Sequence, residues 1–229
     1  MDTLLFRIPA VLIAITIHEY SHGRVAYLLG DGTAKMQGRL TFNPISHMDP
    51  IGMLMLWFVG FGWAKPVPVN PVNFRRDIPM KKSMLYVALA GPLSNLIMAF
   101  VFIGITDLFL RLAYAVSTTN IVMIINPQNP MNPPAIQDSI GLLVLSGIIM
   151  INVYLAIFNL LPIPPLDGSK ILRGLLPREY EHIIDFFNQY GFIILILLIF
   201  TGIISNVLIP LANRIMELLY LPFSILNYL

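Results

Sequence analysis

The residues with the clearest capacity for chemistry stand together in the first apolar stretch, as His18-Glu19-Tyr20-Ser21-His22. Residues four apart share one face of a helix, about 6 Å apart along its axis, so both imidazoles can converge on one metal ion. Glu19 beside the first histidine is placed to act as a general base on water at that metal. The plain alternative is two helix histidines that hydrogen-bond to neighbours. Three ionisable residues in an apolar segment are costly without a joint reason, which favours a metal.

A catalytic zinc ion usually takes three protein ligands and keeps one position open. The chain has no cysteine, so thiolate ligands are excluded. Asp167, where the third long apolar stretch ends, is the predicted third ligand, which gives one Zn²⁺ per chain. His47, in the loop sequence NPISHMDP, is the competing ligand. Its other interpretation is a hydrogen bond that fixes its own loop.

The composition indicates a protein that lies in a lipid bilayer. Of the 229 residues, 57% are hydrophobic and 11% are charged, and the mean hydropathy is +0.77. Soluble domains carry about 25% charged residues, so this chain has too little polar surface for water on all sides. The net charge of +2 makes nucleic acid an unsuitable partner.

The apolar stretches predict an all-α polytopic membrane protein with about four to five transmembrane helices. The predicted spans are residues 4–29, 83–114, 139–161 and 186–209, and residues 212–229 form an interfacial helix or a weak fifth span. The first stretch lacks the basic start of a cleavable signal. The apolar patch 53–63 is too short to span and, with the proline-rich residues after it, predicts a re-entrant, β-hairpin-like segment. We expect one domain over 1–229, with a core at 4–176 and C-terminal helices at 183–229.

Charge counting orients these spans in a cell membrane. Lysine and arginine gather in the loops 30–82 and 162–186 and are absent from the loop 116–138. The positive-inside rule therefore places the first and third loops in the cytoplasm and the N-terminus outside. Span order then brings the two histidines and Asp167 to the same, cytoplasmic side, which supports a shared site independently of the motif.

Three motifs together resemble the site-2 proteases, over residues ~10 to 175. They are the His18–His22 motif, Ala90-Gly91-Pro92-Leu93-Ser94-Asn95 in the second span, and Asn159-Leu160-Leu161-Pro162-Ile163-Pro164-Pro165-Leu166-Asp167-Gly168 at the end of the third. The stretch around His47 is similar to the compact branch of the family, without PDZ or CBS domains. Ser169 stands where many members have a second glycine.

The resemblance implies intramembrane proteolysis of single-span substrate proteins. It implies that His18, His22 and Asp167 bind zinc, that Glu19 is the general base, and that Asn159 helps to polarise the scissile carbonyl. The segment from Gly91 to Asn95 would pack close to the catalytic helix. The candidate substrate-binding region lies around Asn43, His47, Asp49 and Asn95.

Two other classes suit part of the pattern. A membrane metal transporter or sensor also carries intramembrane histidines and acids, but it needs polar groups along a whole pathway, and the second and third spans have few. An inactive scaffold of protease ancestry would keep the fold and lack cleavage that depends on Glu19.

Overall fold

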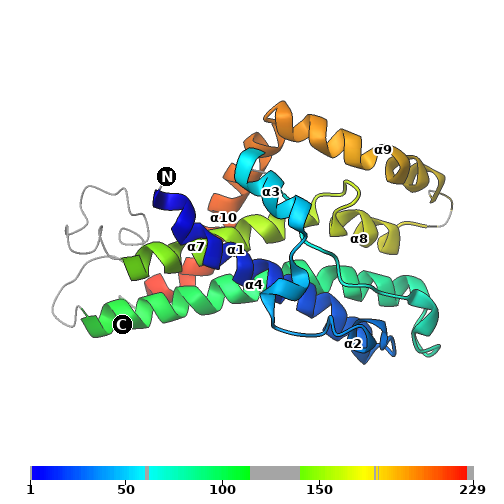
Figure 1. Cartoon of the computed structure of the whole chain (residues 1–229), viewed down its shortest axis with the longest axis horizontal. Helices are drawn as coiled ribbons and strands as arrows, with labels where there is room; N and C mark the ends of the chain where they lie inside the picture. The colour runs from blue at the N-terminus through cyan, green and yellow to red at the C-terminus, as the bar shows by residue number, and fades with distance from the viewer. Residues whose placement is uncertain (1, 60–61, 114–139, 178, 180, 226–229) are drawn as a thin grey trace.

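The computed structural model describes residues 2–59, 62–113, 140–177, 179 and 181–225 (Figure 1). Every regular element in these ranges is a helix, which confirms the predicted all-α class for that part of the chain. The elements are α1 Asp2–Leu28, α2 Thr33–Met36, η1 Pro44–His47, α3 Pro50–Val59, η2 Pro71–Asn73, α4 Met80–Ala113, α7 Ile140–Leu160, α8 Asp167–Leu175, α9 Glu181–Phe200 and α10 Ile203–Ile225. The predicted loop 116–138 and residues 226–229 lie outside the described residues.

Three helices, α1, α4 and α7, each pack against the other two and form the centre of the molecule. Small side chains allow this close approach: Ala14 of α1 and Ala99 of α4 are fully buried, and Gly147 of α7 faces the β-carbon of Ala10. The helix α10 packs on α4 and α7 through Ala212. Polar side chains that point into the three-helix centre therefore lie close to one another and away from water.

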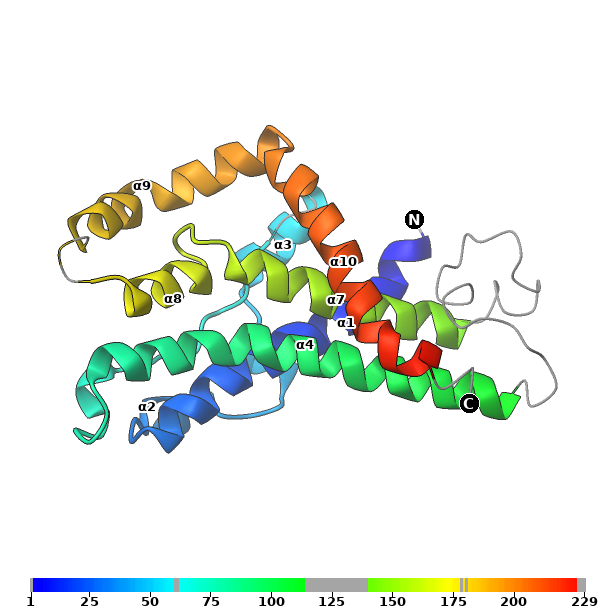
Figure 2. The same cartoon turned by 180° about the vertical axis from the view of Figure 1, so that it is seen from behind.

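The C-terminal part of the chain covers one side of this centre. The short helix α8 contacts α4, α7 and α9, and both Figure 1 and Figure 2 place it between α4 and α9. A cluster of Leu166, Leu195 and Ile204 joins the loop before α8 to α9 and α10. The residues that follow α7 are thereby folded back toward α1, where the histidines lie.

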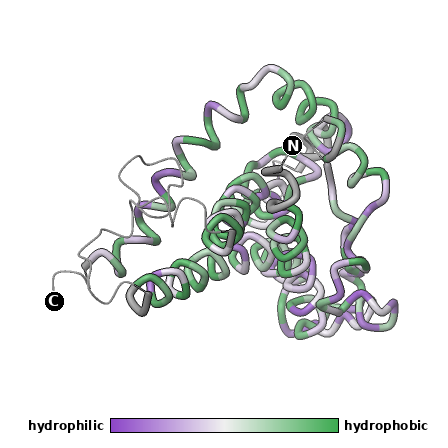
Figure 3. The backbone as a smooth tube through the Cα atoms, turned by 60° about the vertical axis from the view of Figure 1, so that its left-hand side comes forward, coloured by the Kyte–Doolittle hydropathy of each residue, from purple (hydrophilic) through white to green (hydrophobic). Residues whose placement is uncertain are grey.

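Three described helices are long and apolar enough to cross a membrane: Met80–Leu110, Gly141–Leu160 and Ile203–Ser224. The apolar part of α9, Phe187–Phe200, is shorter. Apolar residues predominate along the long helices in Figure 3. These helices indicate a multi-pass membrane protein, and the full number of four to five spans stays a prediction.

The predicted fourth span, 186–209, is wrong in its end. The helix α9 ends at Phe200, and α10 begins at Ile203. Gly202 between them has a φ of +74°, a left-handed conformation that glycine adopts readily and that ends a helix. A glycine inside an apolar run was predicted as part of one helix, and it separates two.

The predicted re-entrant, β-hairpin-like segment is not confirmed, because the part 53–59 of its apolar patch lies in the helix α3. One antiparallel bridge pairs Met48 with Ala64, and the Lys65 N–H donates to the His47 carbonyl over 2.9 Å. Within the described residues, this bridge does not extend into a β-strand. Pro66 and Pro68 have no N–H, so they cannot continue a ladder of backbone hydrogen bonds.

Candidate metal centre

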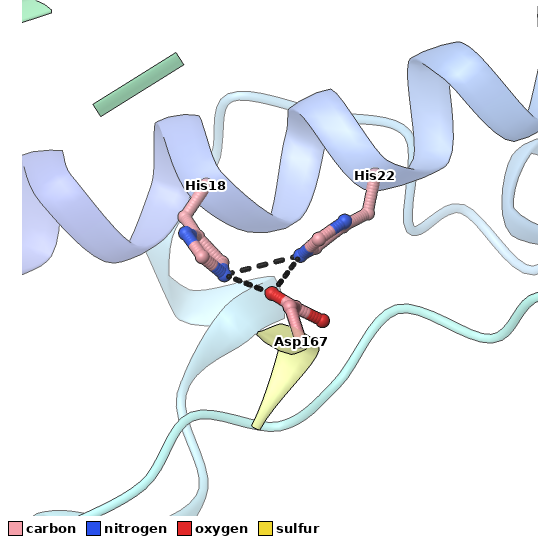
Figure 4. Close-up of side chains that lie close together, drawn as sticks. All are labelled: His18, His22 and Asp167. Carbon is pink, nitrogen blue, oxygen red and sulfur yellow. Dashed lines mark hydrogen bonds and ion pairs between the residues drawn. The ribbon is translucent and has the colours of Figure 1, made fainter. Parts of the chain in front are cut away.

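Helix α1 presents His18 and His22 on one face, toward Asp167 in the first turn of α8 (Figure 4). The Nε2 atom of His18 lies 3.1 Å from Oδ2 of Asp167, and that of His22 lies 3.0 Å from the same oxygen. The two Nε2 atoms are 3.1 Å apart. All three side chains are buried. The three predicted ligands, from segments about 150 residues apart in the chain, therefore meet at one point.

A glycine in the first turn of α8, Gly168, lets Asp167 pack close to the end of α7. A β-carbon on Gly168 would overlap the backbone carbonyl oxygens of Leu160 and Leu161, at the end of α7. The other carboxylate oxygen of Asp167, Oδ1, accepts a hydrogen bond from Lys170 Nζ over 3.1 Å.

Hydrogen bonds behind the two rings decide which nitrogen carries the proton. Nδ1 of His22 lies 2.7 Å from the carbonyl oxygen of Val87, which can only accept, so this nitrogen is the donor. Nδ1 of His18 lies 2.6 Å from Oδ1 of Asn95 and donates to it. Each neutral ring therefore turns the lone pair of Nε2 toward Asp167, in the tautomer that binds a metal.

This arrangement of donors fits a divalent zinc ion. Two nitrogen lone pairs and a carboxylate oxygen lie within 3.1 Å of one another and repel unless positive charge lies among them. Ligand atoms around tetrahedral zinc, with bonds of about 2.0 Å, are about 3.3 Å apart, close to the observed separations. Within the described residues, these three form the group of histidine and acidic side chains able to share a metal ion.

Gly91 on α4 leaves room for the two imidazole rings. A β-carbon built there would lie 2.6 Å from Cε1 and 2.7 Å from Nε2 of His18, and it would also overlap Nε2 of His22. The prediction that the segment from Gly91 to Asn95 packs close to the first helix agrees with these contacts. At this position of α4, only glycine leaves space for the two candidate ligand rings.

Glu19, next to His18 on α1, is held by the extended segment 64–69. Its Oε2 atom accepts a hydrogen bond from the Val67 backbone N–H over 2.8 Å, and its side chain is buried. Glu19 and the three ligands line one cavity of about 650 Å³. The predicted general base and the candidate metal ligands therefore share one cavity.

The cavity is lined mainly by apolar side chains from helices far apart in the sequence. They include Trp63, directly before the extended segment, Val87 of α4, Phe158 of α7 and Phe192 of α9. Asn159 also lines the cavity, and its amide N–H donates to the Leu155 carbonyl over 2.9 Å. A carboxamide has a second N–H, which leaves a donor for a group in the cavity.

None of the four residues around which the substrate-binding region is predicted lines this cavity, and their role in substrate binding stays a prediction. Asn43 and Asp49 accept hydrogen bonds from the backbone N–H groups of Ile45 and Gly52, at the starts of η1 and α3. His47 is fully buried, and its Nε2 bonds to the Thr41 carbonyl over 2.8 Å. This matches the interpretation of His47 as a loop-fixing residue, and it does not join the metal ligands. Asn95 lies behind His18.

Three groups near the site were absent from the residues predicted for it: the Val67 N–H, Lys170 and Asn152. A backbone donor leaves no mark in the sequence. Lys170 follows Asp167 by three residues, and this spacing on a helix could have predicted that the two side chains are neighbours. Asn152 precedes Asn159 by seven residues, which places both amides on one face of α7, and that spacing could have found it.

Comparisons with known proteins point in the same direction as this geometry. Residues 6–200 match the family described as Peptidase family M50. The chain is 39% identical over 209 residues to "Putative zinc metalloprotease YwhC" of Bacillus subtilis, across 91% of this chain and 86% of that protein. It is 27% identical over 200 residues to "Putative zinc metalloprotease Rip2" of Mycolicibacterium smegmatis, across 85% of this chain and 66% of that one.

A third relative matches a shorter region. "Putative zinc metalloprotease MJ0611" of Methanocaldococcus jannaschii is 37% identical over 87 residues, which cover 38% of this chain and 32% of that protein. No solved structure was found to match the chain. The family match covers more than half of the chain, and zinc is the metal that its relatives' names give. The chain belongs to peptidase family M50, the site-2 protease family.

Proposed function

We propose that this protein hydrolyses peptide bonds within or near the transmembrane segments of single-span membrane proteins. One observation carries the proposal: buried Glu19 and the convergent side chains of His18, His22 and Asp167 line a mainly apolar cavity among helices that can cross a membrane. A soluble peptidase has no reason to enclose its site in such helices. A chamber of this kind suits a segment that arrives from the bilayer.

His18, His22 and Asp167 would hold the zinc ion. When bound, zinc supplies a Lewis acid that polarises the peptide carbonyl and makes a water molecule more acidic. The residues of the chain then handle protons and charge. Val87 and Asn95 keep the two rings oriented by accepting from their Nδ1 atoms.

Glu19 would act as the general base and then as the acid. Its carboxylate takes a proton from the attacking water and passes it to the leaving amine. The Val67 N–H fixes one carboxylate oxygen, so the other remains available to the cavity. The free N–H of the Asn159 amide would donate to the oxyanion that develops on the substrate carbonyl.

A substrate has to enter this site in an extended form. A helix hides its peptide bonds in its own hydrogen bonds, so a transmembrane segment must unwind before hydrolysis. We also propose that the N-terminus lies outside the cell and the site toward the cytoplasm, on the strength of the loop charges. The transporter alternative lacks a row of further polar sites: the described residues offer one metal-ligating group.

Membrane protein termini in cells test the proposal directly. Cells that produce the wild-type chain are compared with cells that produce Glu19→Gln, and new N-termini of membrane proteins are identified by mass spectrometry. We expect termini within or next to single transmembrane segments that appear with the wild type and disappear with Glu19→Gln. Purified Glu19→Gln should retain one zinc per chain, because Glu19 is not a predicted ligand.

Glu217→Gln is the matched control, since Glu217 is an exposed residue of α10 paired with Arg214 at 3.0 Å, away from the cavity. It should cleave as the wild type does. Zinc-loaded wild-type protein that yields no Glu19-dependent termini would leave an inactive scaffold. Termini confined to soluble domains far from any span would contradict an intramembrane substrate.

A further inference from the structure

We propose that Asn95 and Asn152 act together as positioning residues, which hold the His18 ring with its Nε2 atom ready for the metal. Asn95 lies on α4 and Asn152 on α7, and both are fully buried. Neither side chain lines the cavity, so neither contacts a substrate there. The inference rests on the proposed function in one respect, that His18 is a zinc ligand.

The two amides form one continuous chain of hydrogen bonds with the histidine. Nδ1 of His18 lies 2.6 Å from Oδ1 of Asn95. Nδ2 of Asn95 donates to Oδ1 of Asn152 over 2.7 Å and to the Ala14 carbonyl over 3.0 Å. Nδ2 of Asn152 donates in turn to the Ile148 carbonyl over 2.8 Å. The chain crosses all three central helices and ends at the metal site.

The backbone at both branches gives this chain a single direction. The carbonyls of Ile148 and Ala14 can only accept, so each amide must turn its NH₂ group toward them. Asn152 then offers its oxygen to Asn95, and Asn95 offers its oxygen to His18. The imidazole must therefore protonate on Nδ1 and keep the lone pair on Nε2. The neutral amides of Asn152 and Asn95 thus select the metal-binding tautomer of His18, and no carboxylate is needed behind the ring.

Asn152 has no contact with a metal ligand, which separates its proposed role from that of Asn95. A carboxamide in the centre of a membrane-spanning helix is unfavourable unless its polar atoms are bonded, and apolar residues surround it on α7. If Asn152 served only to hold the helices together, its amide could point in either direction. The observed orientation, fixed by two backbone carbonyls, is what the His18 tautomer requires.

The test measures metal binding and the His18 tautomer on the full chain in detergent. The variants are Asn152→Leu, which keeps the shape and removes the acceptor, and Asn152→Asp, which keeps an oxygen facing Asn95. Ser146→Ala is the matched control on the same helix, because buried Ser146 donates only to Leu143 within its own helix, over 3.0 Å. Zinc affinity is measured by competition with a chelator, and ring protonation by ¹⁵N NMR of histidine-labelled, metal-free protein.

We expect Asn152→Leu to weaken zinc binding roughly ten-fold, the lower end of the range for outer-shell partners. In the metal-free protein, the Nδ1–H signal of His18 should decrease, because Asn95 then keeps only the Ala14 carbonyl of the two acceptors that orient its amide. Asn152→Asp and Ser146→Ala should keep wild-type affinity and tautomer. If Asn152→Leu fails to fold, Asn152→Ala takes its place with the same expected result.

Wild-type zinc affinity and an unchanged His18 signal in both Asn152→Leu and Asn152→Ala would overturn the proposal and leave Asn152 a packing residue. An equal loss of affinity in Ser146→Ala would overturn it as well, since any polar deletion in α7 would then suffice. A wild-type chain that binds no zinc would refute the positioning role together with the proposed function. Zinc binding without cleavage would refute only the proposed function.

Discussion

The backbone N–H of Val67 donates to Oε2 of Glu19 over 2.8 Å and so connects the extended segment 64–69 to the helix of the two histidines. Val67 stands between Pro66 and Pro68, neither of which has an N–H. A residue before proline is restricted to extended conformations, so the prolines stiffen the segment at this point. The Arg39 guanidinium also holds this segment, by donating to the Lys65 carbonyl over 2.7 Å.

Val67→Pro should lower turnover with zinc content unchanged. The substitution keeps an extended backbone and removes the one N–H that orients the Glu19 carboxylate. We expect a loss of about ten-fold or more in kcat, less than the 10²–10⁴-fold that a general base typically contributes, because Glu19 itself is kept. Cleavage rate and zinc stoichiometry are measured on the same purified protein, with Val69→Pro as control in the same segment. An increased rate in Val67→Pro would mean that this contact restrains Glu19 in a resting form.

Local patterns predicted the parts of the site that one helix carries. His18, Glu19 and His22 lie within five residues, so helical spacing alone relates their side chains. Asp167 is distant in the chain, but it follows a long apolar stretch whose end could be counted to the same side of the membrane. The loop charges and the span lengths were thus sufficient to predict that Asp167 lies at the same depth as the two histidines.

Contacts between helices could not be predicted in the same way. Which faces of α4 and α7 meet α1 depends on small residues and on packing, so the hydrogen bond between Asn95 and His18 could not be predicted from the sequence. The turn at Gly202 was missed because an apolar glycine is compatible with either a helix or its end. The Val67 donor is a backbone group, and every residue except proline has one.

Gly91→Ala should reduce zinc affinity by at least about ten-fold, as changes next to metal ligands do. The added methyl group would overlap both imidazole rings, and the rings would have to rotate away from Asp167. Gly104→Ala is the control on the same helix, because its new methyl group would lie 3.2 Å from the end of the Phe223 ring, which can move slightly. Competition with a chelator measures both. Full zinc affinity in Gly91→Ala would show that α4 can shift away from α1.

Lys170→Met should weaken zinc binding by no more than about five-fold, since a half-exposed ion pair contributes about 0–1 kcal/mol. Lys170 Nζ lies 3.1 Å from Oδ1 of Asp167, and half of its side chain is exposed. The effect should diminish in high salt, which screens exposed charges. Lys82→Met, an exposed lysine at the start of α4, is the control. A hundred-fold loss would instead make Lys170 essential for the orientation of the carboxylate.

Asp31 organises the chain that follows α1. Its buried carboxylate accepts from the Asn70 N–H over 2.7 Å, from the Asn73 amide over 3.0 Å, and from both the N–H and the hydroxyl of Thr33. Burial raises the pKa of Asp31, but the bonds from Thr33, Asn73 and Asn70 outweigh it and lower the pKa below its usual value. This residue therefore holds the end of the extended segment, and hence Val67, near Glu19.

Asp31→Asn should lower the free energy of unfolding by about 1–3 kcal/mol at pH 7, because it turns an NH₂ group toward buried donors. A lowered pKa means that the carboxylate stabilises the fold above its unfolded pKa of about 3.9, and that this contribution is lost as the pH falls through the lower folded value. The difference between wild type and variant should thus be constant from pH 7 to 5 and shrink below pH 4. Thermal unfolding of the metal-free proteins measures this difference without a contribution from zinc binding. A difference that grows in acid would mean that Asp31 is protonated in the fold and acts as a donor.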